Sequence, residues 1–82
     1  MNLQEFNEKI EAIKSIAKKY DYIFVSTDTH VGRVSFRNRI STFRIDIYTT
    51  KMTVCILPKG DNPEYHKNQS FESIEKIFKG LV

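Results

Sequence analysis

The chain has few of the residues on which disulfide, phosphate-binding and membrane-spanning motifs depend. It contains one cysteine, Cys55, so it cannot form an intrachain disulfide. Three glycines and two prolines leave no glycine-rich phosphate-binding loop. No apolar run approaches the ~20 residues that span a bilayer, and the first residues, MNLQEFNEKI, lack the apolar segment of a signal peptide. These absences predict a protein of the reducing cytoplasm with no membrane partner.

The length and charge of the chain further limit the kind of protein that it can be. The 82 residues predict a single domain, 1–82, near the lower size limit for independent folding. Thirteen lysines and arginines against ten acids leave a mild formal charge of +3. The basic residues are unevenly placed, because four arginines fall within twelve residues that contain no acid: Arg33, Arg37, Arg39 and Arg44.

Apolar and polar residues alternate along three consecutive stretches, which is the period of a half-buried strand. We expect strands at about 32–37, 42–49 and 52–57, after an aromatic and β-branched first strand at 21–27. One face would carry Val34, Phe36, Phe43, Ile45, Ile47, Val54 and Ile56. The other would carry Arg33, Ser35, Arg37, Arg44, Asp46, Tyr48, Thr53 and Cys55. The pattern predicts an antiparallel sheet with one polar, arginine-rich face.

Two amphipathic helices flank these strands. Apolar residues recur every three or four positions over 3–20, where Asn2 and Glu5 have the spacing of a capping box. A second apolar stripe, with Phe71 and Phe78 in it, follows Ser70, a good N-cap residue. The segment 58–69 is predicted to be a long loop. The expected fold is an α+β two-layer sandwich of order α-β-β-β-β-α, a four-stranded antiparallel sheet with both helices packed on one face.

Cross-strand pairs on the polar face favour one register. Phe36 opposite Phe43 places Arg33 opposite Asp46, whereas a shift by two residues would place Arg37 against Arg44. In the next hairpin, Ile47 opposite Val54 leaves Thr50 and Lys51 as a two-residue turn.

The arginine-rich face is the main candidate site. Guanidinium groups match paired oxygens of phosphates and carboxylates, and a tyrosine can stack on an exposed base. The predicted partner-binding residues are three arginines and a tyrosine on the face, with one basic residue at each of two hairpin tips: Arg33, Arg37, Arg44, Tyr48, Arg39 and Lys51. A plainer interpretation is a solvated face whose charges maintain solubility.

Other clusters offer less chemistry. His66 shares its loop with Asp61 and Glu64, and Asp28 is near His30, but neither group has the spacing of a metal site. A Cys55–His66 nucleophilic pair would lack the usual exposed turn. We therefore expect that the protein is not an enzyme and that it uses no cofactor, metal or small-molecule substrate.

Two functions agree with these residues. The first is a non-enzymatic binding module that engages a polyanionic partner, RNA, DNA or a nucleoprotein, through the arginine and tyrosine face. The alternative is a small protein-binding inhibitor or adaptor of the anti-defence kind encoded by phages and mobile elements. In that case an edge strand or the 58–69 loop would dock a partner, including another copy of the chain.

Overall fold

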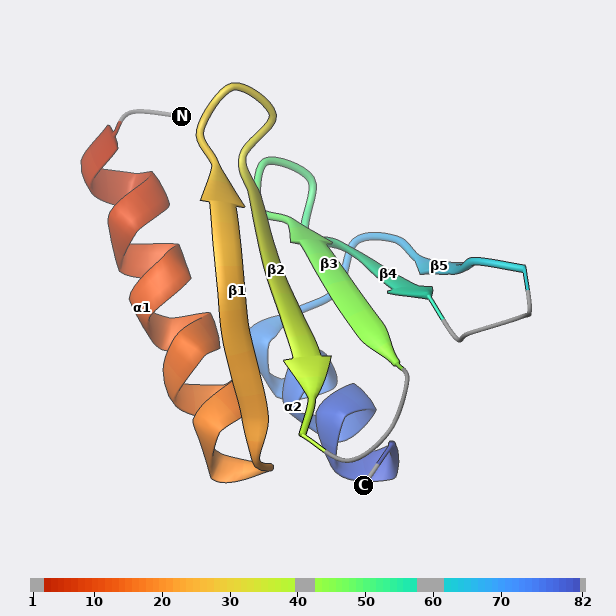
Figure 1. The fold of residues 1–82 in the computed structure, drawn as a ribbon. Coiled ribbons are helices and arrows are strands. Elements are labelled where there is room, and N and C mark those ends of the chain that lie inside the picture. Colours follow the sequence, from red (N-terminus) through yellow and green to blue (C-terminus); the bar gives the residue numbers. More distant parts are fainter. Residues whose placement is uncertain (1–2, 40–42, 58–61, 82) are drawn as a thin grey trace.

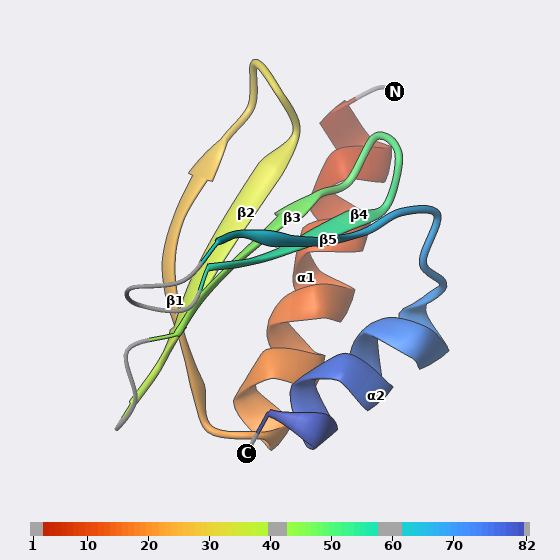
Figure 2. The same ribbon diagram turned by 90° about the vertical axis from the view of Figure 1, so that its right-hand side faces the viewer.

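The fold consists of two helices and one antiparallel sheet (Figure 1). The computed structural model describes residues 3–39, 43–57 and 62–81. The elements in chain order are α1 (Leu3–Lys19), β1 (Tyr22–Asp28), β2 (Arg33–Asn38), β3 (Arg44–Tyr48), β4 (Thr53–Leu57), β5 (Glu64–His66) and α2 (Phe71–Gly80). The strands follow one another across the sheet in the order β1-β2-β3-β4-β5. Both helices pack on the same side of the sheet, as Figure 2 shows, so the predicted two-layer arrangement is confirmed.

The sheet has five strands rather than the predicted four. The additional strand, β5, lies within the segment 58–69, which the sequence predicts to be a loop, and it pairs with β4 through Cys55 and Tyr65. This strand is only three residues long. Such a short stretch has no measurable alternation, and it is extended because β4 offers an unpaired edge. Residues 58–61 of the predicted loop lie outside the described residues.

Both helices contribute to the core largely as the apolar periodicity predicts. Helix α1 buries Phe6, Ile10, Ile13 and Ala17, whereas Leu3, predicted in the stripe, is 67% exposed. Helix α2 buries Ile74 and Phe78, while Phe71 at its first position is 40% exposed. The N-cap Asn2 predicted for the first helix lies outside the described residues.

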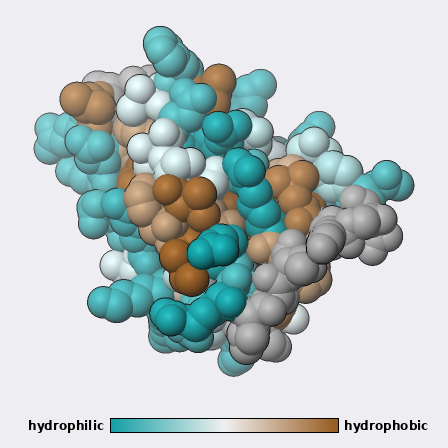
Figure 3. Space-filling view, in the orientation of Figure 1, coloured by the Kyte–Doolittle hydropathy of each residue, from teal (hydrophilic) through white to brown (hydrophobic). Residues whose placement is uncertain are grey.

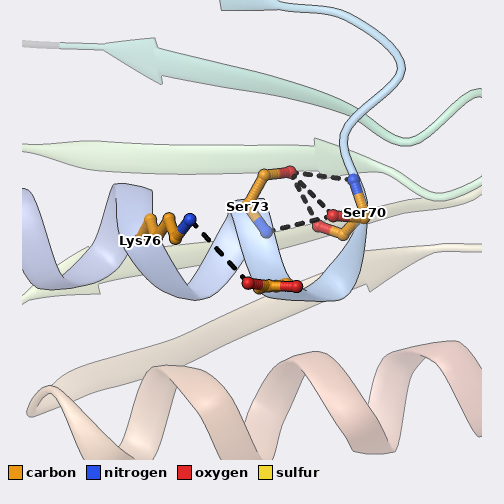
Figure 4. A network of polar contacts seen from close by, with 4 residues as sticks. Ser70, Ser73 and Lys76 are labelled. Atoms are coloured by element: carbon orange, nitrogen blue, oxygen red, sulfur yellow. Dashed lines mark hydrogen bonds and ion pairs between the residues drawn. The ribbon is translucent and has the colours of Figure 1, made fainter.

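Ser70 caps α2 as predicted (Figure 4). Its side chain accepts a hydrogen bond from the backbone N–H of Ser73 at 3.1 Å. In return the Ser70 backbone N–H donates to Ser73 Oγ at 2.8 Å. This reciprocal pair satisfies two backbone donors at the start of the helix, where no helical acceptor exists.

Aromatic contacts join the helix layer to the sheet. The ring of Phe78 from α2 packs edge-on against Tyr22 and Phe36, with centroids 4.9 and 5.8 Å apart. Phe24 extends this cluster toward α1, where Lys14 Nζ lies 4.2 Å from the centre of its ring. The core therefore connects α2 to the two N-terminal strands.

The register between β2 and β3 differs from the predicted one by two residues. Val34 lies opposite Ile47 and Phe36 opposite Ile45, which places Arg37 opposite Arg44. The predicted register would have placed Ile47 opposite Gly32. Burying an isoleucine contributes about 1.5–3 kcal/mol, whereas one cross-strand charge pair contributes only about 0.2–1 kcal/mol. The apolar rows on the core side therefore determine the register, even though this register places Arg37 opposite Arg44.

The turn between β3 and β4 is held by hydrogen bonds to two other parts of the fold. Ile47 lies opposite Val54 as predicted, but pairing ends at Tyr48 and Thr53, so residues 49–52 form the turn instead of two residues. Thr49 is buried, and its backbone N–H and its hydroxyl both donate to Gly32 O, at 2.8 and 2.7 Å. Lys9 of α1 donates to Thr49 O at 3.1 Å. The turn is thereby fixed to the β1–β2 loop and to α1.

A β-bulge at Val25 changes the facing of β1. Phe24 lies opposite Phe36, but Ser26 lies opposite Ser35, so Val25 is one extra residue in the strand. The residues after the bulge are shifted to the other face of the sheet. Asp28 consequently lies opposite Arg33 on the face away from the helices.

Candidate functional site

The sheet face away from the helices, called here the outer face, is organised as three cross-strand rows. The upper row contains Asp28, Arg33, Tyr48 and Thr53. The middle row contains Ser26, Ser35, Asp46, Cys55 and Tyr65. The lower row contains Ile23, Arg37, Arg44 and Leu57. Four of the six predicted partner-binding residues, Arg33, Arg37, Arg44 and Tyr48, therefore share this face.

Two of the three arginines on the outer face are paired with carboxylates of the same face. Arg44 Nε lies 3.0 Å from Asp46 Oδ1, and the Asp46 side chain is only 7% exposed. Arg33 Nη2 lies 3.7 Å from Asp28 Oδ2, a longer contact between partly exposed side chains. Three guanidinium groups and two carboxylates leave the face with a small positive excess.

Arg37 is the unpaired member of this set. It is exposed, and it forms no ion pair with any residue in the part of the chain that the structure describes. Its cross-strand neighbour is Arg44, so two guanidinium groups start from directly opposed positions. Like charges in this arrangement destabilise a sheet. An anion placed between them would remove that repulsion.

The centre of the middle row is buried although both described helices lie on the other side of the sheet (Figure 2). Ser35, Asp46 and Cys55 are all nearly inaccessible. Burial raises the pKa of the Cys55 thiol, and this outweighs the opposing effect of its hydrogen bond with Tyr65. The same hydrogen bond is the main reason why the pKa of Tyr65 is raised. Cys55 is thus a covered thiol whose surroundings disfavour the thiolate, which is the reactive form.

The two hairpin-tip residues differ in their surroundings. Arg39 follows β2 and is ion-paired through Nε with Asp21 Oδ1 at 3.2 Å, with both side chains largely exposed. Lys51 is exposed in the β3–β4 turn and has no ion pair within the described ranges. It lines a hollow together with Tyr48 and Tyr65. Lys51 therefore belongs with the outer face, whereas Arg39 lies beside the turn after α1.

The other clusters do not assemble a reactive site. Cys55 lies opposite Tyr65, and His66 lies opposite the buried Val54, so the Cys55 and His66 side chains leave opposite faces of the sheet. His66 Nε2 lies 3.4 Å from Glu64 Oε1. Asp61, predicted near them, is outside the described residues. His30 donates its backbone N–H to Asp28 Oδ1 at 3.0 Å, which is a local turn contact. Among the residues with described positions, no three His, Cys, Asp or Glu side chains converge on a point.

Tyr65 and the apolar part of the face were not foreseen as site features. Tyr65 is 60% exposed, and only the assignment of β5 places it beside Cys55. The apolar residues Ile23 and Val25 come from β1, whose facing depends on the bulge. Figure 3 shows a brown area over β1 and another toward β4, separated by teal side chains over β2 and β3. The outer face is therefore not uniformly polar. Its three arginines, Arg33, Arg37 and Arg44, form a basic strip between two apolar areas.

Comparison with known proteins supplies no family for this chain. No protein-family model, no curated protein and no solved structure matches it. Within the described residues, no helix is long and apolar enough to cross a membrane.

Proposed function

We propose that this domain is a non-enzymatic binding module that engages a polyanion, RNA or DNA, through the basic strip of its outer face. The observation that supports this most directly is the opposed pair Arg37 and Arg44, of which Arg37 lacks a counterion among the described residues. Two guanidinium groups side by side present several N–H donors to one phosphate or to two successive phosphates. Lys51 extends the positive charge along the face, beyond the upper row.

The salt dependence of binding tests this proposal and counts the contacts. For a single strand, log affinity falls with log salt by about 0.7 per phosphate contacted. If only Arg37 and Lys51 bind phosphate, the slope is about 1.4; if the ligand also displaces the carboxylates from Arg33 and Arg44, it is about 2.8. Fluorescence anisotropy with labelled oligonucleotides at several salt concentrations measures this slope.

The decisive variant is Arg37→Glu, with Lys18→Glu as its matched control. Both positions are exposed, and each substitution lowers the formal charge by two from +3, but Lys18 lies on α1 in the other layer. We expect Arg37→Glu to weaken binding strongly and Lys18→Glu to leave it nearly unchanged. Equal losses would mean that net charge alone attracts the ligand, and an absence of wild-type binding at low salt would refute the proposal. Reversing Arg33 and Arg44 is less informative, because each new carboxylate would lie beside Asp28 or Asp46.

The alternative is a protein-binding inhibitor or adaptor of the kind that phages and mobile elements encode. The exposed apolar side chains along the β1 edge and the β1–β2 loop favour it: Phe24 at 41%, Val25 at 47% and Val31 at 49%. This second function would be supported if the purified domain does not bind oligonucleotides but retains a protein partner after nuclease treatment. The Val25→Lys variant should then lose that partner.

A further inference from the structure

The β3–β4 turn meets the β1–β2 loop at one end of the sheet (Figure 1). A hollow in the outer face lies beside this turn. Its volume is about 360 Å³, within the range of about 300–1,000 Å³ found for sites that hold small organic groups. The lining residues are Val31, Tyr48, Thr50, Lys51, Thr53 and Tyr65. No carboxylate is among them, although the same face carries Asp28 in its upper row and Asp46 in its middle row.

Two tyrosine rings border this hollow from opposite sides. Tyr48 is on β3 and Tyr65 on β5, with β4 between them. Neighbouring strands are about 4.8 Å apart, and the partner of Tyr65 on β4 is two residues from the partner of Tyr48, so the two side chains start roughly 12 Å from each other. Tyr65 lies directly opposite Cys55 in the β4–β5 pairing, and 60% of it is exposed. Two aromatic side chains therefore border the space that a flat group would occupy.

The rim of the hollow carries the cation Lys51, and a second cation, Arg33, lies nearby in an ion pair of 3.7 Å with Asp28. Lys51 projects from the turn that Thr49 fixes to Gly32, and the backbone of Gln69 donates to Met52 O at 2.9 Å on its other side. Arg33 is the direct cross-strand neighbour of Tyr48. Its Nε is buried and has no hydrogen-bond partner in the described structure. Cations next to exposed aromatic rings are complementary to a base that carries a phosphate.

We infer that this hollow is a nucleobase subsite for a single-stranded nucleic acid. One base stacks on Tyr48 and Tyr65, and the flanking phosphates contact Lys51 and Arg33. A base in a duplex is stacked on its neighbours and cannot enter such a hollow, so the subsite selects an unpaired strand. This inference depends on the proposed polyanion binding and adds the strandedness of the ligand and the residues that recognise it.

The test compares Tyr65→Leu with Tyr65→Phe, using anisotropy with labelled oligo(dT), oligo(U) and a duplex of equal length. Because a base stacked on an aromatic ring loses about 1–3 kcal/mol when the ring is removed, Tyr65→Leu should weaken single-strand binding roughly 5- to 150-fold. Tyr65→Phe should retain binding within a few-fold. Phe71→Leu, which removes a partly exposed ring from the helix layer, should have no effect.

The outcomes separate the subsite from the proposed function. If Arg37→Glu weakens binding but Tyr65→Leu does not, or if the wild type binds duplex as tightly as single strands, the polyanion proposal stands and the subsite is wrong. If the wild type binds neither, both fail. Should Tyr65→Leu not fold, ultraviolet crosslinking of the wild type to a bromouracil-containing strand decides the question. Crosslinks at Tyr48 or Tyr65 support the subsite, and crosslinks confined to the helix layer overturn it.

Discussion

Replacing Arg37 by glutamine should stabilise the free domain at low ionic strength. Arg37 lies directly opposite Arg44, and no carboxylate of the described residues is paired with it. Removing one of two opposed like charges removes their repulsion, while glutamine keeps most of the length of the side chain. A site that binds an anion in this way is less stable without its ligand than a neutral site would be.

The magnitude follows from the sheet geometry. Opposed residues are about 5 Å apart, and two unit charges at that distance in water repel by roughly 0.8 kcal/mol. This agrees with the range of about 0.2–1 kcal/mol for cross-strand pairs. Asp46, 3.0 Å from Arg44, offsets part of the repulsion, so we expect a gain of about 0.3–0.8 kcal/mol. For a domain of this size the melting temperature should rise by about 1–6 °C.

Thermal and urea unfolding of Arg37→Gln, followed by circular dichroism at low and high salt, measures this gain. It should be largest near 10 mM salt, where the Debye length is about 30 Å, and vanish near 1 M, where it is about 3 Å. Arg33→Gln is the control and should lower the free energy of unfolding, because Arg33 is paired with Asp28 and partly buried. A destabilised Arg37→Gln, or a gain that is the same at both salt concentrations, would contradict the electrostatic reasoning.

Three further predictions concern the scaffold that holds the face. Gly32→Ala should destabilise the domain by about 1–2 kcal/mol or more in urea unfolding, since Gly32 has φ +67° and an added Cβ would lie 2.9 Å from a Thr50 side-chain atom. Ser70→Ala should cost about 1 kcal/mol in the same assay through loss of the α2 cap. Hydrogen bonds from Tyr20 and then Lys19 lower the pKa of Glu75 below 4.5. The stability they confer is present above that pH and is lost as the pH falls through the folded-state pKa, so the melting temperature of Glu75→Gln should fall less than that of the wild type on acidification.

The two faces of the sheet could be predicted from the sequence because alternation is a local property. Arg33, Arg37, Arg44 and Tyr48 share a face in any register that preserves the facing of their strands. The predicted register was wrong because it rested on charge pairs of the outer face alone, without the apolar pairs of the core side. The larger energy lies on the core side, where Phe36 with Ile45 and Val34 with Ile47 form continuous apolar rows.

Strand β5 and Tyr65 could not be predicted in the same way. Three residues carry no periodic signal, and they are extended because β4 presents backbone groups that need partners. The position of Tyr65 beside Cys55 therefore depends on a tertiary contact between segments with no shared pattern. The hollow beside the β3–β4 turn, which is lined by this ring, could not be predicted from the sequence for the same reason.

The bulge at Val25 follows from the polarity of the residues after it. Without an extra residue, strict alternation from Tyr22 would direct Ser26 and Asp28 toward the helices, and a carboxylate buried there without a partner would cost several kcal/mol. The bulge turns Asp28 to the outer face, where it neutralises Arg33. An aspartate that ends an alternating strand on the core side is thus a reason to expect a bulge. Arg37 lies opposite Ile23, before the bulge, and among the described residues it stays the arginine of the basic strip without a carboxylate partner.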